Sequence, residues 1–194
     1  RGNIDLDRGT FAFFYKPLYE PDAGEWNSLA GVSTEIEGYW AGVLEFNNKQ
    51  NINRQTSFVL HFFDIGRYSP VLEFKPIFQR WKKDEWHHLA LVWDRTQGIT
   101  IYEDGARAAS NSGRFRWDWN AEPRILVFGS WIYSTAPFAL DEVHCYAECL
   151  TDEQVAALAQ GRRPTGPPIP ITPEAQRREA DLARMGWAPD DLAQ

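Results

Sequence analysis

Residues 84–109 limit the fold more than any other segment, because their pattern is that of a β-hairpin. An apolar and aromatic run at residues 86–93 is followed by a polar stretch that ends in Gly98. Residues 99–102 are again rich in strand-forming types, and Asp104-Gly105 favours a two-residue turn. We therefore expect consecutive antiparallel strands joined by tight turns in this part of the chain.

Short β-rich runs separated by polar turns continue this pattern from residue 9 to residue 146. The loops at residues 47–53 and 64–70 contain Asn, Gly and Asp, which favour turns. Many short strands with almost no helix between them are typical of an antiparallel sandwich. The predicted strands are residues 10–15, 29–33, 40–46, 57–63, 71–74, 87–93, 99–103, 106–110, 125–128 and 139–146.

A short helix is predicted after the last strand. Thr151 and Gln154 have the spacing of a capping box, in which each side chain bonds a backbone N–H of the first helical turn. Asp152 and Glu153 place negative charge at the positive end of the helix dipole. Gly161 is a typical helix stop, so we expect the helix to end just before it.

The segment at residues 162–171, RRPTGPPIPI, is proline-rich and is predicted to be an extended linker, because proline cannot join a sheet interior. A second helix is expected to begin with Thr172 as its cap and to stop at Gly186. The predicted division is a sandwich at residues 1–161 and a linker plus helix at residues 162–194. This helix either docks on the sandwich or leads to a further domain.

The charge of the chain restricts its partners. It has 27 acidic and 20 basic residues, which gives a net charge of −7. Nucleic acids and anionic membrane surfaces select basic patches, so we expect neither as a partner. No apolar run approaches the ~20 residues of a membrane span. The chain begins at Arg1 without a signal-peptide pattern, so we expect it to be a piece of a larger protein.

The two cysteines, Cys145 and Cys149, have two interpretations. On one extended strand they would be ~13 Å apart. A disulfide needs Cα atoms within ~7 Å, so a bond forms only if the chain turns at residues 146–148. The alternatives are therefore two small buried side chains or a local disulfide.

Four segments together resemble the laminin-G-like domains of the concanavalin A-like jelly-roll superfamily. The resemblance runs from about residue 9 to residue 161, although residues 20–83 match only as generic strands. The matching segments are an aromatic-rich opening strand that ends in Lys16-Pro17, a tryptophan strand at residues 86–94, a strand and turn at residues 98–105, and a closing strand and helix at residues 140–154.

The resemblance implies an all-β fold, a two-sheet antiparallel jelly-roll sandwich with a short C-terminal helix. The residues after it add the expected Pro-rich linker to a second helix. The resemblance also implies a non-catalytic recognition module for glycans or proteins in a secreted or cell-surface protein. Many members of the superfamily hold a calcium ion. Because this fold hosts lectins, adhesion modules and glycan-cleaving enzymes alike, the site must decide the function.

Calcium is the expected cofactor, with Asp141 as its ligand. Asp141 and Glu142 are adjacent acids that offer the hard oxygen ligands calcium prefers, and the resemblance favours Asp141. Further ligands are expected from Asn3, Asp5 and Asp7, which point to one side if the segment is extended. The alternative is that one acid is solvated, the other caps a loop, and the N-terminal segment is a solvated tail.

Aromatic residues alternate in two segments, residues 115–119 and 131–133. On a strand, alternate rings share one face. Exposed rings would stack on the apolar faces of sugars while charged neighbours bond their hydroxyls, whereas buried rings would be part of the core. The predicted ligand-binding residues are Arg116, Trp117, Trp119, Trp131 and Tyr133.

An enzyme is the second hypothesis: a glycoside hydrolase or polysaccharide lyase of the same fold. It would need paired carboxylates, for which Glu35 and Glu37 or Asp141 and Glu142 are the candidates. The consecutive histidines at residues 87–88 face opposite ways on a strand, so a structural role is expected for both. A third hypothesis is a structural domain that packs on a partner domain of the same chain through a flat apolar patch.

Overall fold

The computed structural model describes residues 8–20, 27–36, 39–50, 56–64, 67–74, 81–94, 97–111, 125–128, 137–171, 173 and 176–177. Within residues 27–74 and 125–128 it describes the path of the backbone. The predicted ligand-binding residues, the N-terminal acids and most of the predicted second helix lie outside these ranges.

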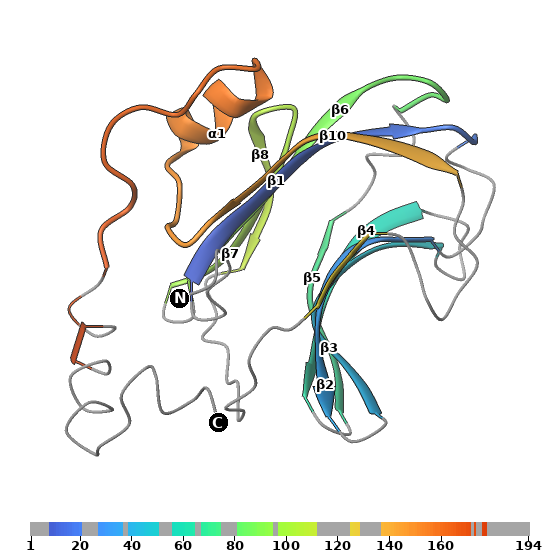
Figure 1. The fold of residues 1–194 in the computed structure, drawn as a ribbon, viewed down its shortest axis with the longest axis horizontal. Coiled ribbons are helices and arrows are strands. Elements are labelled where there is room, and N and C mark those ends of the chain that lie inside the picture. The colour runs from blue at the N-terminus through green and yellow to red at the C-terminus, as the bar shows by residue number, and fades with distance from the viewer. Residues whose placement is uncertain are drawn as a thin grey trace.

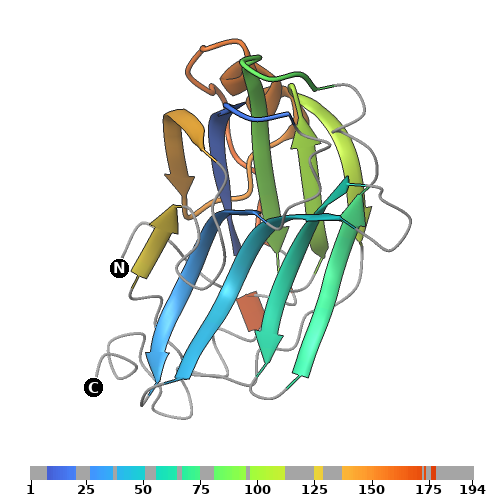
Figure 2. The same cartoon turned by 90° about the vertical axis from the view of Figure 1, so that its right-hand side faces the viewer.

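The described strands form two antiparallel sheets that face each other (Figures 1 and 2). The first sheet has the strand order β10-β1-β6-β7-β8, and the second has the order β5-β4-β3-β2-β9. The two-sheet antiparallel sandwich predicted from the sequence is therefore confirmed. The elements are β1 (Arg8–Pro17), β2 (Asn27–Ile36), β3 (Tyr39–Gln50), β4 (Thr56–Asp64), β5 (Arg67–Phe74), β6 (His87–Asp94), β7 (Gly98–Glu103), β8 (Ala106–Asn111), β9 (Ile125–Phe128), β10 (Phe138–Tyr146) and α1 (Asp152–Ala159).

The predicted hairpin is present as strands β6, β7 and β8. The turn between β7 and β8 has φ angles of 50° at Asp104 and 82° at Gly105. Positive φ at both turn residues is what a tight two-residue turn requires, which explains the Asp-Gly pair. Gly105 also lies against α1, because a Cβ at this position would be 3.0 Å from the Ala159 Cβ.

The face of the first sheet that looks toward the second sheet is packed with aromatic rings. Alternation along β1 directs Phe11, Phe13 and Tyr15 to this face, and each is 7% exposed or less. The Tyr15 ring centroid lies 5.9 Å from that of Trp81 and 5.5 Å from that of Phe138. Aromatic side chains therefore form the first sheet's share of the core between the sheets.

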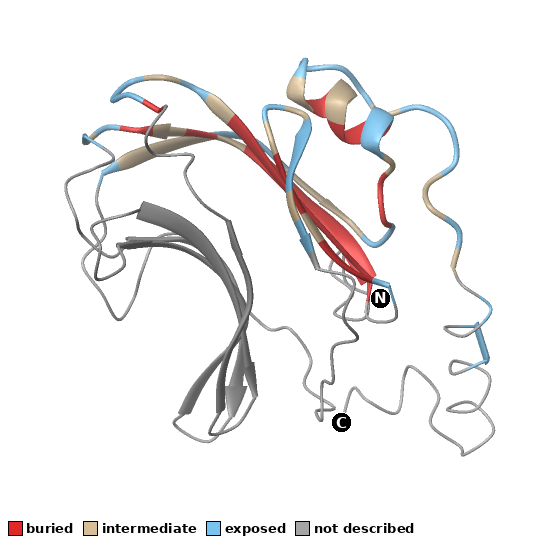
Figure 3. Ribbon diagram, turned by 180° about the vertical axis from the view of Figure 1, so that it is seen from behind, coloured by how far each residue is buried: buried red, intermediate tan, exposed pale blue. Residues whose placement is uncertain are grey.

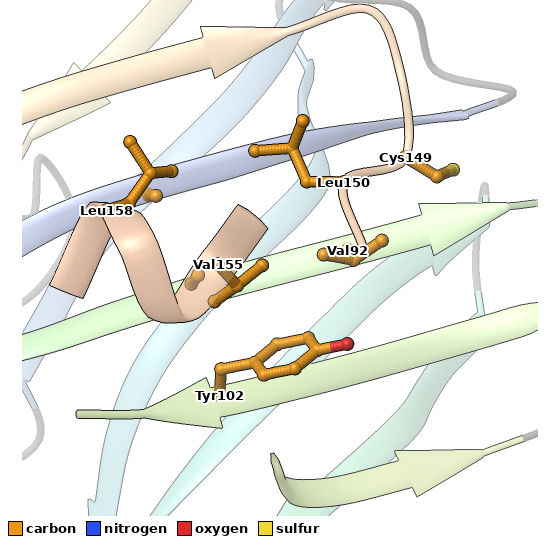
Figure 4. Close-up of a cluster of buried hydrophobic side chains, with 8 residues drawn as sticks. Val92, Tyr102, Cys149, Leu150, Val155 and Leu158 are labelled. Carbon is orange, nitrogen blue, oxygen red and sulfur yellow. The ribbon is translucent and has the colours of Figure 1, made fainter. Parts of the chain in front are cut away.

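The opposite face of the first sheet, its outer face, is covered in part by α1 (Figures 1 and 3). Val155 and Leu158 of α1 pack on Val92 and Tyr102 of the sheet, and the view in Figure 4 shows these side chains pointing toward one another. Full burial of one such apolar side chain stabilises a fold by about 1.5–3 kcal/mol. This second cluster therefore fixes the helix to the sandwich.

Side-chain hydrogen bonds also fix the start of α1. The predicted capping box is present, because Thr151 accepts from the Gln154 backbone N–H and the Gln154 side chain accepts from the Thr151 N–H. Arg107 of β8 forms an ion pair with Asp152, with 2.8 Å between Nη2 and Oδ1, and the Tyr102 hydroxyl donates to the same oxygen at 2.7 Å. In the described part of the chain, no helix is long and apolar enough to span a membrane.

Residues 162–171, which we call the C-terminal strap, run along the outer side of the sandwich instead of leaving it. Ile169 packs on the cluster beneath α1, and its carbonyl accepts a hydrogen bond from the buried Arg8 guanidinium at 2.8 Å. The Ile169 N–H donates to the Cys149 carbonyl at 2.8 Å, and the Gln154 side-chain amide donates to carbonyls of the strap. The segment predicted as a linker therefore contacts the sheet directly.

Gly9 gives a first test of this packing. It pairs with Trp93, and a Cβ at residue 9 would lie 2.6 Å from the Trp93 Cζ2 and 2.8 Å from the Tyr146 carbonyl oxygen. We expect Gly9→Ala to lower the free energy of unfolding by about 2 kcal/mol, as overpacked cores do. Urea denaturation measures this change. A Gly9→Ala, Trp93→Phe double variant should lose less unfolding free energy than the sum of the losses in the two single variants, because the smaller ring makes room for the added methyl group. Losses that add fully would show that this methyl group does not clash with the Trp93 ring.

Candidate functional site

The outer face of the first sheet has one half without a described element over it. α1 lies over Ala12, Ala90 and Val92, whereas the strands continue beyond it to the end of β1 and the start of β6 (Figure 3). On this half, Phe14 pairs with His88 of β6 and with Asp141 of β10. The last described β1–β6 pair is Tyr15 with His87, so one further step along the register sets Lys16 opposite Trp86.

We call the surface formed by Phe14, Lys16, Trp86, Ala139 and Asp141 the open end. Antiparallel partners project their side chains to the same face, so the register brings these residues together although they come from three separate parts of the sequence. A sheet end of this kind offers a rigid surface, because three paired strands hold its backbone. The open end is therefore the candidate site among the described residues.

Trp86 is the central feature of the open end. Its side chain is 43% exposed, unlike Trp81 and Trp93, which are each 4% exposed. The Lys16 ammonium lies over the Trp86 ring with Nζ 4.8 Å from the ring centroid. Such a cation–π contact at an exposed site is worth about 0.5–1 kcal/mol, enough to bias the orientation of both side chains. The site thus combines an accessible aromatic ring with a positioned positive charge.

Asp141 contributes an exposed carboxylate to the same face. Between Ala12 and Phe14 the register shifts, because β10 has one extra residue opposite β1. Glu142 takes up this bulge with a φ of 49°, and its N–H donates to the Asp141 Oδ1 at 2.8 Å. Bulges redirect side chains at sheet edges, and a positive φ at a non-glycine residue is a costly conformation that often marks a functional position.

The calcium prediction at Asp141 is not tested by this geometry. Among the residues that the structure describes, no group of three or more acidic, histidine or cysteine side chains is arranged to hold a metal. The further ligands expected from Asn3, Asp5 and Asp7 lie outside the described residues. Calcium binding at Asp141 therefore stays a prediction.

His88 lies at the boundary between the open end and the part covered by α1. It is 2% exposed, and neither ring nitrogen has a hydrogen-bond partner. The Phe14 ring meets its ring edge-on at a centroid distance of 5.0 Å. Burial lowers the pKa of His88 to about 4, an effect that nearby Asp104 opposes and His144 assists. His88 is therefore a neutral packing residue at neutral pH.

His87 points to the other face, as the strand alternation predicts. Its ring stacks on Trp81 with centroids 4.1 Å apart, and its Nδ1 lies 3.0 Å from the Asp104 Oδ2. Asp104 also accepts the His88 backbone N–H at 2.8 Å. Burial favours the neutral form of Asp104, but the hydrogen bonds from both histidines hold the pKa of this carboxyl below its ordinary value. Both histidines thus have structural contacts.

The predicted aromatic site, Arg116, Trp117, Trp119, Trp131 and Tyr133, lies outside the described residues and stays a prediction. Lys16 and Trp86 were not predicted as site residues, because in the sequence they stand at a strand end and in an apolar run. One signal for them exists in the sequence, because Trp86 and His88 are two residues apart and so share a face. This two-residue spacing does not predict that α1 leaves Trp86 uncovered.

The remaining sequence-predicted groups are placed as follows. Cys145 and Cys149 are free thiols, so the predicted local disulfide is wrong. Cys149 is buried, as the alternative interpretation predicted, and its Sγ donates to the Trp93 carbonyl at 3.0 Å. Burial raises the pKa of both thiols. Glu35 lies on β2 opposite Trp40, and Glu37 is outside the described residues.

A comparison with protein families supports the resemblance predicted from the sequence. The family model described as the concanavalin A-like lectin/glucanases superfamily matches residues 78–156. This stretch contains the tryptophan strand, the hairpin turn and the start of α1. The resemblance to this superfamily is thus confirmed. A search of curated proteins gives no significant match.

Solved structures with the same fold include the binding domain of botulinum neurotoxin DC in complex with rat synaptotagmin II, with a TM-score of 0.63, 9% identity and 80% of this chain covered. A botulinum neurotoxin serotype D binding domain has a TM-score of 0.58, 8% identity and 83% coverage. A mutant of Trypanosoma rangeli sialidase displaying trans-sialidase activity has a TM-score of 0.58, 18% identity and 79% coverage.

These similarities confirm the jelly-roll sandwich as the fold of the chain. The chain spans 36%, 38% and 23% of the three solved structures, respectively, so it corresponds to one part of each. At these identities the likeness concerns the fold alone.

Proposed function

We propose that this domain is a non-catalytic recognition module that binds a carbohydrate at the open end of its first sheet. The observation that carries the proposal is the exposed Trp86 ring, which lies beneath the Lys16 ammonium on a rigid sheet face that also carries the Asp141 carboxylate. Binding sites combine an apolar or aromatic platform with a few fixed polar groups, which give orientation and specificity. A sugar ring meets both needs, because it has an apolar face and a rim of hydroxyls.

The open end supplies each of these contacts. The indole of Trp86 offers the platform, and aromatic residues of this kind often dominate binding energies. The Asp141 carboxylate accepts hydrogen bonds from hydroxyls, and the Lys16 ammonium donates them. Calcium at Asp141 belongs to the same proposal: a bound ion would orient this carboxylate and offer further coordination to hydroxyl oxygens.

A glycan-cleaving enzyme fits the described acids less well. Cleavage uses two carboxyl groups on opposite sides of the sugar, about 5–9.5 Å apart, and one of them has a raised pKa. Asp141 and Glu142 are instead adjacent and exposed on β10, which is the edge strand of its sheet. The Glu142 carboxylate lies 3.4 Å from the His144 Nε2. This placement favours recognition over cleavage.

The proposal also covers the kind of protein to which the domain belongs. Superfamily resemblance and likeness to domains that form one part of larger proteins support a module of a larger secreted or cell-surface protein. Its partner would be a glycan or, in the alternative, another domain of the same chain. The strap directs the chain along the outer side of the sandwich before it reaches residue 171.

A glycan array tests the proposal. We expect the protein to bind a subset of glycans, and Trp86→Ala to weaken that binding by about 10–100-fold, in the range of a lost aromatic hot spot. Val143→Ala is the matched control, because Val143 is 41% exposed but lies outside the open end. Thermal melting should show that both variants stay folded.

Three results of the array separate the alternatives. Loss of binding on chelation of calcium would support the ion at Asp141. Loss in Trp117→Ala or Trp119→Ala, with Trp86→Ala unaffected, would move the site to the predicted aromatic segment. The absence of binding to any glycan by a folded protein would contradict the carbohydrate proposal and favour the domain-packing role.

A further inference from the structure

The positive charge of Lys16, in addition to its contact with Trp86, indicates which class of ligand the open end prefers. In the part of the chain that the structure describes, no carboxylate lies within ion-pair distance of the Lys16 ammonium, and the Trp86 ring is its neighbour at 4.8 Å. The surrounding protein has an overall charge of −7. Lys16, like the exposed Lys83, has no carboxylate partner among the described residues, but it is held over an aromatic ring.

Three acids of the segments around the open end have partners other than Lys16. Glu85 lies 3.9 Å from the Lys82 ammonium and 3.8 Å from the His87 Nε2. Glu142 faces His144, and Asp104 faces His87. These three carboxylates therefore do not neutralise Lys16, whose ammonium contacts the Trp86 ring.

Other charged residues lie close to Lys16 and also affect the charge of the open end. The segment before Trp86 carries Lys82, Lys83, Asp84 and Glu85, so its positive and negative charges are equal in number. Asp141 lies on the same face as Lys16 but pairs with Phe14, whereas Lys16 pairs with Ala139, two residues away along β10. The ammonium and this carboxylate are therefore diagonal neighbours that do not form an ion pair, so they can contact different groups of one ligand.

We propose that the open end selects an anionic sugar, one that carries a carboxylate or a sulfate, by pairing that group with Lys16 while the sugar ring stacks on Trp86. This inference rests on the proposed carbohydrate-binding function and adds the class of sugar. The ring face and the anionic group of such a unit lie side by side, as the indole and the ammonium do here. Hydrogen bonds between charged partners are about twice as strong as neutral ones, so the anionic group decides the choice.

The experiment compares matched glycans on the full chain by isothermal titration calorimetry. An oligogalacturonate carries carboxylates, its methyl ester has the same rings without the charge, and a sulfated carrageenan oligomer tests the alternative anion. We expect at least one anionic oligomer to bind about 10-fold or more tightly than the neutral ester, which corresponds to about 1.4 kcal/mol. This preference should shrink as sodium chloride is raised, because exposed charge pairs are screened.

Variants at residue 16 identify the group responsible. Lys16→Gln should weaken binding of the anionic oligomer about 10-fold more than binding of the ester, so that the preference is lost, whereas Lys16→Arg should retain most of the preference. Lys83→Gln is the matched control, since it removes an exposed lysine of the neighbouring turn and should change each affinity by less than about 2-fold.

The outcomes separate the two proposals. Equal binding of the ester and the anionic oligomers by the unaltered protein would overturn the anionic preference and keep the carbohydrate site. A preference that survives in Lys16→Gln would overturn the role of Lys16. Failure of every oligomer, charged or neutral, to bind a folded protein would overturn the carbohydrate function itself, and the inference with it.

Discussion

A chain that ends at Gly161 is expected to lose about 3–5 kcal/mol of unfolding free energy, because it lacks the C-terminal strap. Ile169 would no longer pack on the cluster beneath α1. The Arg8 guanidinium, 8% exposed, would lose the Ile169 carbonyl, and the Gln154 amide would lose the carbonyls of Thr165 and Gly166. Each neutral hydrogen bond lost costs about 0.5–1.5 kcal/mol, and one made by a charged group such as Arg8 costs about 1.5–3 kcal/mol.

The matched control is a chain that ends at Ile171. It keeps all of these contacts, and the described residues beyond it, Pro173, Gln176 and Arg177, are exposed and bond only within residues 171–177. Its unfolding free energy, measured by urea denaturation, should stay within about 1 kcal/mol of that of the full chain. Equal stability of the two truncated chains would show that the strap is a linker, as the sequence analysis predicted.

This difference between prediction and structure has a physical origin. Proline-rich composition excludes the strap from a sheet interior, and that part of the prediction was sound. What holds the strap is the pairing of its backbone carbonyls with the Arg8 and Gln154 side chains. Every residue has a carbonyl, so such acceptors leave no pattern in the sequence.

Local features were predicted well because their causes are local. The Asp104-Gly105 turn needs only two residues with positive φ, and the capping box needs only Thr151 and Gln154 at the right spacing. The open end depends instead on the register between β1 and β6, which pairs residues such as Phe14 and His88 that are far apart in sequence. Neither that register nor the extent of α1 on the outer face follows from spacing along one strand.

Acidification is expected to destabilise the domain between about pH 6.5 and pH 4 through His88, by up to about 3 kcal/mol. The folded-state pKa of His88 is lowered to about 4 by burial, whereas the ordinary value is 6.5. The folded protein therefore binds this proton less readily than the unfolded chain does. The stabilising contribution is complete above pH 6.5 and is lost as the pH falls toward the folded-state pKa.

Other groups that affect acid stability act mainly at lower pH. Asp104 and Asp152 have pKa values below the ordinary 3.8, so they contribute stability that is lost mainly below about pH 4. The Arg107 guanidinium is the main cause for Asp152. Urea denaturation at a series of pH values should therefore show a separate decline in stability above the range in which these carboxylates titrate.

His88→Phe distinguishes His88 from the remaining histidines. The ring nitrogens of His88 have no hydrogen-bond partner, and its backbone N–H to Asp104 is kept in the variant. Replacing an unpartnered buried polar ring by an apolar one is close to neutral, so stability at pH 7 should change by less than about 1 kcal/mol. Between pH 6.5 and pH 4 the variant should lose much less stability than the unaltered protein, while His144→Gln should retain the decline. If the unfolding free energy of His88→Phe declines equally steeply between pH 6.5 and pH 4, another group causes the decline. The buried His88 ring would then contribute to packing but not to the pH dependence of stability.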